Sequence, residues 1–299
     1  MNFTIATTLD DALNAVADGA RPVAGGSDLV VGARQGKKPL PDSVVAIDRI
    51  QSLGGIDVSK DGVRIGALVT HARLEIDDDI VKAYPGLADA SALVGSPSTR
   101  NVGTLGGNVM NASPAMDTGA PLLVLGAEIE LQSTKGNRRL PIGKLWTAPG
   151  STAAQADELC VAVHLPSQPA RSSSAYVRLE YRRAMEIAVV GAAASVTLDE
   201  DGGLAALSVA LTAVAPTIIA VDDLEALIGR QVDAALLADV AARASARSTP
   251  ISDLRASERY RRHCVGVMAS RAVDAAARRA RGESIAVPVN RSLGIGAAS

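Results

Sequence analysis

The chain has 299 residues and a formal net charge of −2; 47% of its residues are hydrophobic, but only 2% are aromatic. This length suits about two domains of roughly 150 residues each, and their cores must be built mainly from Ala, Val, Leu and Ile. The charge excludes a globally basic nucleic-acid binder, and the scarcity of aromatic side chains disfavours base stacking with single strands. We therefore expect no nucleic-acid partner.

The two cysteines, Cys160 and Cys264, are far apart and form no CxxC motif, and the three histidines are equally scattered. This spacing gives no support for a disulfide framework, a zinc site or an iron–sulfur cluster within the chain. We therefore expect no metal site.

The first residues lack a basic stretch followed by an apolar core, so we expect no signal peptide. The longest apolar run, 204–221, contains Pro216, which would break a helix. A strand followed by a turn explains this run better than a membrane span. We expect a cytoplasmic protein without a membrane span.

The N-terminal residues predict a small β–α–β unit. Residues 7–20 read as an amphipathic helix, with Thr8 as its N-cap and Gly19 as its C-terminal stop. The other elements predicted here are strands over 21–24 and 43–48 and a helix over 29–34.

A second pattern begins at Gly62, with strands of period two. Strands are predicted over 63–68, 127–132 and 159–165, and helices over 71–78 and 83–94. Residues 168–174 have linker composition, which places a domain boundary there.

The C-terminal half predicts an antiparallel sheet followed by helices, an α+β arrangement. Strands over 187–198 and 204–213 flank Asp199-Glu-Asp-Gly-Gly203, a strong hairpin signal. Helices are predicted over 221–228, 234–246 and 258–281. The segment 243–283 carries ten arginines and is either a solvated helix face or a docking surface for a partner subunit.

Two glycine-rich turns are the most informative features of the chain: Pro22-Val-Ala-Gly-Gly-Ser-Asp28 and Asn101-Val-Gly-Thr-Leu-Gly-Gly-Asn108. Glycine lets a ligand approach the backbone closely, and consecutive amides in such turns form anion sites. Two such turns predict a ligand with two phosphates. Neither matches the dinucleotide fingerprint GxGxxG or the phosphate loop GxxxxGK[ST], which disfavours an ordinary Rossmann or NTPase site.

Each turn also has a purely structural interpretation. In the first, Ser27 or Asp28 could simply cap a following helix. The second is followed by Asn111-Ala-Ser-Pro-Ala-Met-Asp117, whose polar side chains could pair within a network of turn hydrogen bonds. No general acid–base pair or nucleophilic triad emerges, so we identify no catalytic residue.

Several motifs together resemble the FAD-binding medium subunit of molybdenum hydroxylases, the family of carbon monoxide dehydrogenase and xanthine dehydrogenase. They occur in order along nearly the whole chain. The motifs are Pro22-Val-Ala-Gly-Gly-Ser-Asp-Leu29, Ile65-Gly-Ala67, Arg100-Asn-Val-Gly-Thr-Leu-Gly-Gly-Asn108, Asn111–Asp117, Asp157-Glu-Leu159, Ala175-Tyr-Val-Arg178, Arg182-Arg183, Ala188-Val-Val-Gly-Ala192 and Asp253-Leu-Arg-Ala-Ser-Glu-Arg-Tyr-Arg261.

The resemblance implies an α+β fold: a two-lobed FAD-binding domain of the PCMH type, followed by a C-terminal domain with an antiparallel sheet plus helices. The implied ranges are 1–170 for the FAD domain, with lobes of about 1–57 and 58–170, then 175–284 for the second domain, and 285–299 as a flexible tail.

The resemblance also implies the cofactor site, with FAD bound non-covalently. Both turns would cradle the pyrophosphate, Asp117 would contact the polar part of the cofactor, and Arg178 would approach the flavin where lysine is common. Cys160 would lie on the strand that lines the flavin, as a small packed thiol. The residues assigned to the turns are Pro22, Val23, Ala24, Gly25, Gly26, Ser27 and Asp28, and Thr104, Leu105, Gly106, Gly107 and Asn108.

The implied function is electron relay. Molybdenum cofactor and 2Fe-2S clusters would lie only in a large and a small partner subunit, and the FAD of this chain would pass electrons to an external acceptor. The implied assembly is a dimer of heterotrimers. A stand-alone flavin oxidoreductase and a scaffold subunit without FAD are the alternatives.

Overall fold

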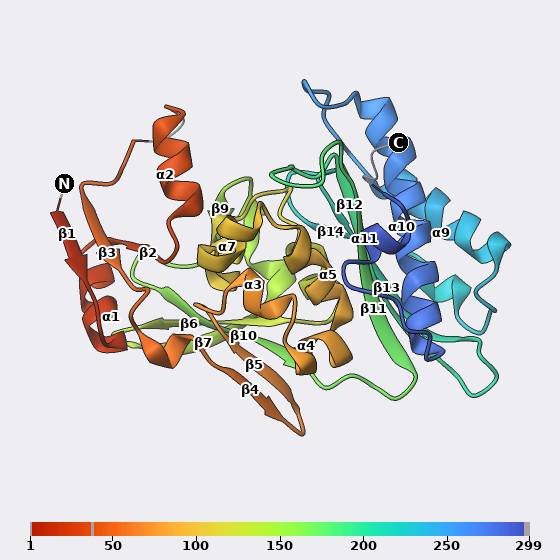
Figure 1. The fold of residues 1–299 in the computed structure, drawn as a ribbon, viewed down its shortest axis with the longest axis horizontal. Helices are drawn as coiled ribbons and strands as arrows, with labels where there is room; N and C mark the ends of the chain where they lie inside the picture. Colours follow the sequence, from red (N-terminus) through yellow and green to blue (C-terminus); the bar gives the residue numbers. More distant parts are fainter. Residues whose placement is uncertain (1, 37–38, 296–299) are drawn as a thin grey trace.

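The computed structural model describes residues 2–36 and 39–295, which contain three large sheets in succession and a small two-stranded sheet of β8 (Trp146–Ala148) and β9 (Ser151–Thr152) (Figure 1). The first is parallel, with the order β1 (Asn2–Ile5), β3 (Ser43–Ala46), β2 (Arg21–Val23). Its flanking helices are α1 (Leu9–Ala17) and α2 (Ser27–Arg34). The hydroxyl of Thr8 accepts a hydrogen bond from the amide of Asp11, so the predicted cap of α1 is confirmed.

The second sheet is antiparallel, with the order β4 (Ile56–Ser59), β5 (Gly62–Gly66), β10 (Leu159–Pro166), β6 (Glu128–Ser133), β7 (Gly136–Pro141). The central strand β10 joins two cores. Leu159 and Val161 pack with the core of the first lobe, whereas Cys160 and Val163 pack with the core beneath the helices. The side chains of β10 alternate between the two cores, with a register shift between Cys160 and Ala162, and so hold the two lobes together.

The helices between β5 and β6 form one layer. They are α3 (His71–Leu74), α4 (Asp78–Ala83), α5 (Pro85–Leu93), α6 (Pro97–Val102), α7 (Leu105–Asn111) and α8 (Gly119–Val124). The expected helix over 83–94 begins only at Pro85, because a residue before proline is disfavoured in helical geometry. Shorter elements are η1 (Gln51–Leu53), η2 (Ile142–Lys144), β8 (Trp146–Ala148) and β9 (Ser151–Thr152).

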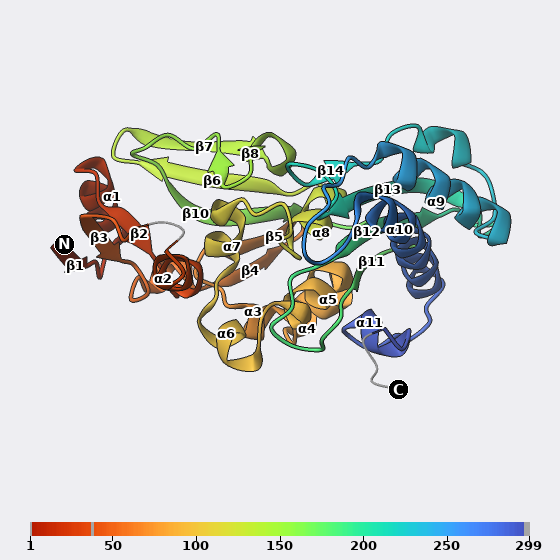
Figure 2. The ribbon, with the colours of Figure 1, turned by 90° about the horizontal axis from the view of Figure 1, so that it is seen from above.

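The third sheet has the order β11 (Ser172–Leu179), β12 (Val190–Leu198), β13 (Leu204–Thr212), β14 (Ile219–Ala220) and is antiparallel. Two long helices, α9 (Ala234–Arg247) and α10 (Glu258–Ala280), cover one face, while α5 and α8 of the preceding domain cover the other (Figure 2). The α+β fold class, with an antiparallel C-terminal sheet and helices, is confirmed. Among the described residues, no helix is long and apolar enough to cross a membrane.

Two sequence expectations differ from the structure in this domain. The expected helix over 221–228 contains only a short 3-10 turn, η3 (Leu224–Leu227), which follows Asp223 at a positive φ of 59°. The segment 285–295, expected to belong to a flexible tail, includes α11 (Val289–Ser292) and buries Val289 and Asn290. Val289 packs in an apolar core and Asn290 makes hydrogen bonds, and the sequence pattern does not reveal these partners. Residues 296–299 of the expected tail lie outside the described residues.

A buried carboxylate joins the helical layer to the C-terminal domain. Asp89 on α5 is fully buried and accepts hydrogen bonds from both Nη atoms of Arg279, at 2.7 and 3.0 Å. The backbone amides of Tyr176 and Val289 donate to the same carboxylate. One side chain therefore holds α5, α10, β11 and α11 together.

We expect Arg279→Leu to lower the free energy of unfolding by about 3–5 kcal/mol, because the change leaves Asp89 as an uncompensated buried charge. Arg278→Leu is the matched control, since Arg278 pairs with Glu283 at the surface, where such pairs contribute about 0–1 kcal/mol. Urea unfolding of both variants measures the difference. Equal losses would contradict the role of Asp89.

Candidate functional site

The first glycine turn lies at the start of α2. Gly26 has a φ of 66°, in the left-handed region that favours glycine, and it occupies the N-cap position. No side chain caps the helix, so the first amides of α2 lack the partner that an N-cap residue supplies. The interpretation in which Ser27 or Asp28 caps this helix is therefore wrong.

The two turns pack directly against each other. A Cβ on Gly25 would overlap the carbonyl oxygen of Val102, and a Cβ on Gly103 would lie 3.8 Å from the hydroxyl of Ser27. Figures 1 and 2 show α2 beside α7, where the first lobe meets the helical layer. The uncapped start of α2 thus faces the second turn across a narrow junction.

The second turn is built differently from the first. Thr104 is the N-cap of α7, and its hydroxyl accepts from the amide of Gly107 at 3.1 Å. The amides of Leu105 and Gly106 donate to the carbonyls of Val69 and Ala67. We expected open amides in both turns. In the second turn they are used internally, because this turn is hydrogen-bonded to the segment that follows β5. Gly107 remains exposed, and only the hydroxyl of Thr104 would lie near an added Cβ.

A buried histidine lies behind this junction. His71 is 1% exposed, its amide donates to the carbonyl of Gly103, and its Nδ1 has no hydrogen-bond partner among the described residues. Burial, followed by the positive charge of Arg100, lowers the pKa of His71 to about 4. His71 is therefore neutral at neutral pH.

A chain of hydrogen bonds leads from the second turn to the C-terminal domain. Asn108 accepts from the hydroxyl of Thr118 at 2.6 Å, and the neighbouring Asp117 binds two groups of β11. The hydroxyl of Tyr176 donates to one oxygen of Asp117 at 2.8 Å, and Arg178 Nη1 donates to the other at 2.7 Å. Asp117 and Arg178, 61 residues apart in sequence, are thus in contact.

Arg178 is fully buried and makes ion pairs with two carboxylates. Besides Asp117, it contacts Glu180, to which its Nε donates at 2.7 Å. Burial disfavours the charged guanidinium, but the negative charges of Asp117 and Glu180 and the hydrogen bond to Glu180 outweigh it and raise the pKa of Arg178. The cluster therefore holds the guanidinium of Arg178 in its charged form, between two carboxylates, inside the junction of the two domains.

Cys160 lies apart from this cluster. Its side chain is buried in the core on β10, and burial, with a smaller effect of Glu130, raises the pKa of the thiol to about 12. A thiol in this state is protonated and unreactive at neutral pH.

The structure brings together the first turn, the second turn and the pair of Asp117 and Arg178, but it leaves Cys160 in the core. Four residues of this region, His71, Thr118, Tyr176 and Glu180, were not predicted. Tyr176 on β11 and Glu180, the first residue after that strand, lie two positions on either side of Arg178, and this period of two could have indicated them. No local signal marks His71 or Thr118, because their partners are distant in sequence.

The pKa of His71 predicts a pH-dependent stability. In the unfolded chain its pKa is about 6.5, so unfolding takes up a proton between pH 6.5 and about 4. Neutral His71 therefore adds about 3 kcal/mol to the free energy of unfolding above pH 6.5. This stability is lost as the pH falls from 6.5 to about 4. Urea unfolding at several pH values should show a shallower acid loss for His71→Gln. Parallel curves for the variant and the parent would refute the assignment.

Comparisons with known proteins cover nearly the whole chain. Residues 1–168 match the family described as the FAD binding domain in molybdopterin dehydrogenase, and residues 174–276 match the CO dehydrogenase flavoprotein C-terminal domain. The xanthine dehydrogenase FAD-binding subunit of Escherichia coli O157:H7 is 33% identical over 292 residues, which cover 93% of this chain and 96% of the relative. The carbon monoxide dehydrogenase medium chain of Afipia carboxidovorans is 33% identical over 271 residues, covering 90% and 93%.

Solved structures agree with these matches. Reconstituted CO dehydrogenase from Oligotropha carboxidovorans superimposes with a TM-score of 0.88 at 30% identity, covering 93% of this chain and 98% of the other. Quinoline 2-oxidoreductase from Pseudomonas putida 86 gives 0.84 at 27% identity, covering 94% and 98%. The resemblance inferred from the motifs along the chain is confirmed. The chain belongs to the family of FAD-binding medium subunits of molybdenum hydroxylases and is an oxidoreductase subunit.

Proposed function

We propose that this chain binds one FAD non-covalently and relays electrons from a partner subunit through the flavin to an external acceptor. The observation that carries this proposal is the uncapped start of α2 at the contact of the two glycine turns. A helix start with free amides favours an anion. The orphaned Nδ1 of buried His71 behind the same junction also fits a polar ligand.

The pyrophosphate would lie between the turns. The first turn, Pro22 to Asp28, would offer the amides at the start of α2. The second, Thr104 to Asn108, would offer the exposed backbone at Gly107 and the side chain of Asn108. The amides of Leu105 and Gly106 already donate to carbonyl groups of the protein. These two residues would therefore line the site, and the amides that contact the phosphates would come from the first turn.

The flavin end would lie toward the cluster of Asp117, Tyr176 and Arg178. Bound FAD supplies the redox chemistry, and the protein supplies position and electrostatics. Asp117 would orient the polar chain of the cofactor, and the guanidinium of Arg178, fixed between Asp117 and Glu180, would approach the ring. Cys160 would act only as a packed thiol behind the site, since burial keeps it protonated.

The assembly we propose is a dimer of heterotrimers in the cytoplasm. A large subunit would hold the molybdenum cofactor, and a small subunit would hold the 2Fe-2S clusters. The scattered cysteines of this chain support that division, because such clusters need groups of thiolates. The names of the relatives, a medium chain and an FAD-binding subunit, support it as well. We place the FAD domain at 1–170 and the second domain at 175–284.

Flavin content tests the proposal directly. The purified protein, or protein refolded with FAD, should show flavin absorbance with about one FAD per chain. Gly107→Val should remove the flavin, because its side chain would fill the space that a ligand needs beside an exposed backbone, while crowding only the hydroxyl of Thr104.

Gly32→Ala is the matched control. Gly32 lies within α2 and has no atom within 4 Å of an added Cβ, so this variant should retain the flavin. A colourless parent protein without affinity for FAD would refute the proposed function. A parent that binds FAD, together with Gly107→Val protein that retains it, would refute only the role of the second turn.

A further inference from the structure

A short turn before α10, residues 251–257, is held rigidly but exposes its apolar side chains. Asp253 accepts hydrogen bonds from the amides of Arg255 and Ala256 at 2.8 and 3.2 Å. Arg261, which is buried, donates to Asp253 at 2.7 Å and to the carbonyl of Val189 at 2.5 Å. The turn is therefore fixed to the C-terminal sheet.

The apex of this turn presents hydrophobic surface to solvent. The exposed fraction is 108% for Leu254 and 70% for Ile251. No neighbouring residue that the structure describes covers the side chain of Leu254. Local hydrogen bonds fix the backbone on both sides of Leu254. A backbone that is fixed before binding loses little conformational freedom when the turn binds a partner, which is the property expected of an anchor in a protein–protein interface.

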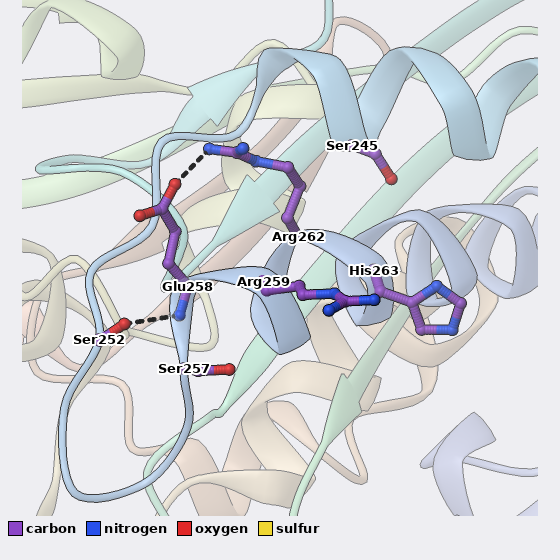
Figure 3. A pocket seen from close by; sticks show the side chains of 7 residues that line it. All are labelled: Ser245, Ser252, Ser257, Glu258, Arg259, Arg262 and His263. Carbon is purple, nitrogen blue, oxygen red and sulfur yellow. Dashed lines mark hydrogen bonds and ion pairs between the residues drawn. The ribbon is translucent and has the colours of Figure 1, made fainter.

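A basic hollow of about 610 Å³ lies next to the turn, lined by Ser252, Ser257 and the first residues of α10 (Figure 3). Arg262 donates to Glu258 at 2.6 Å. Arg259 points across the hollow toward His263 and has no carboxylate partner within the described ranges. Arg259, one of the ten arginines of the segment 243–283, thus places a charge without an ion pair among the described residues at this hollow.

The turn is connected to the proposed flavin site. The hydroxyl of Tyr181 donates to the carbonyl of Arg255 at 2.8 Å, and Tyr181 follows directly on Glu180, which pairs with Arg178. Residues 178–181 therefore link the Asp117 cluster to the 251–257 turn. A protein bound at this turn would lie close to the flavin end of the site.

We propose that the 251–257 turn and the basic hollow form the docking surface for the iron–sulfur partner subunit. This inference rests on the proposed function, in which that subunit delivers electrons to the flavin and so must bind near it. The partner would offer an apolar pocket for Leu254, rimmed by carboxylates that pair with Arg259. Aliphatic burial at the centre and charge at the rim is the usual composition of such interfaces.

Leu254→Asp in the complex co-expressed with both partner subunits tests this surface. The exposed position keeps the fold and the flavin unaffected, so the FAD per chain should equal that of the parent. The Kd for the iron–sulfur subunit should rise roughly 30-fold or more, the loss typical of an interface hot spot. Arg259→Glu should weaken binding as well, and the effect should shrink at high salt.

Ile76→Asp is the control, because Ile76 is 74% exposed and lies just after α3, in the preceding helical layer. This variant should leave the Kd unchanged. Four results would overturn the proposal: an unchanged Kd for both variants, loss of the large subunit alone, loss of self-association alone, or an equal effect of Ile76→Asp. A parent without FAD would instead refute the proposed function, so flavin content and subunit affinity separate the two failures.

Discussion

The contact between Gly25 and the carbonyl of Val102 is the constraint on which the site depends. Any side chain at Gly25 would overlap that oxygen, so the first lobe can approach the helical layer this closely only with glycine there. The approach places the uncapped start of α2 against the second turn. The two turns differ in their hydrogen bonds. The amides at the start of α2 have no capping side chain, whereas the second turn is hydrogen-bonded to the segment that follows β5.

Buried charge determines how the C-terminal domain joins this site. Asp89 pairs with Arg279, and Asp117 pairs with Arg178, so two ion pairs cross the junction between the domains. Removing one partner from such a pair is costly because the other charge stays buried. The two ion pairs therefore fix how the domains pack against each other. Hydrogen bonds of Asn108, Thr118 and Asp117 connect this junction to the second glycine turn.

Local patterns in the sequence predicted the local structure well. The cap at Thr8, the hairpin around 199–203 and the long helix from Glu258 all follow from short-range rules. Contacts between distant residues were not predictable in this way. The pairing of Asp89 with Arg279 spans 190 residues, and the internal use of the second turn's amides depends on carbonyls of Val69 and Ala67, which periodicity does not reveal.

The central claim is that the junction of the two turns recognises a pyrophosphate, and ligand discrimination tests it most directly. Calorimetric titration of the flavin-free protein with FAD, FMN and riboflavin separates the contribution of the phosphates from that of the ring. The account predicts that FAD binds far more tightly than FMN, and FMN more tightly than riboflavin, because only FAD places two phosphates between the turns. Equal affinities for FAD and riboflavin would contradict it.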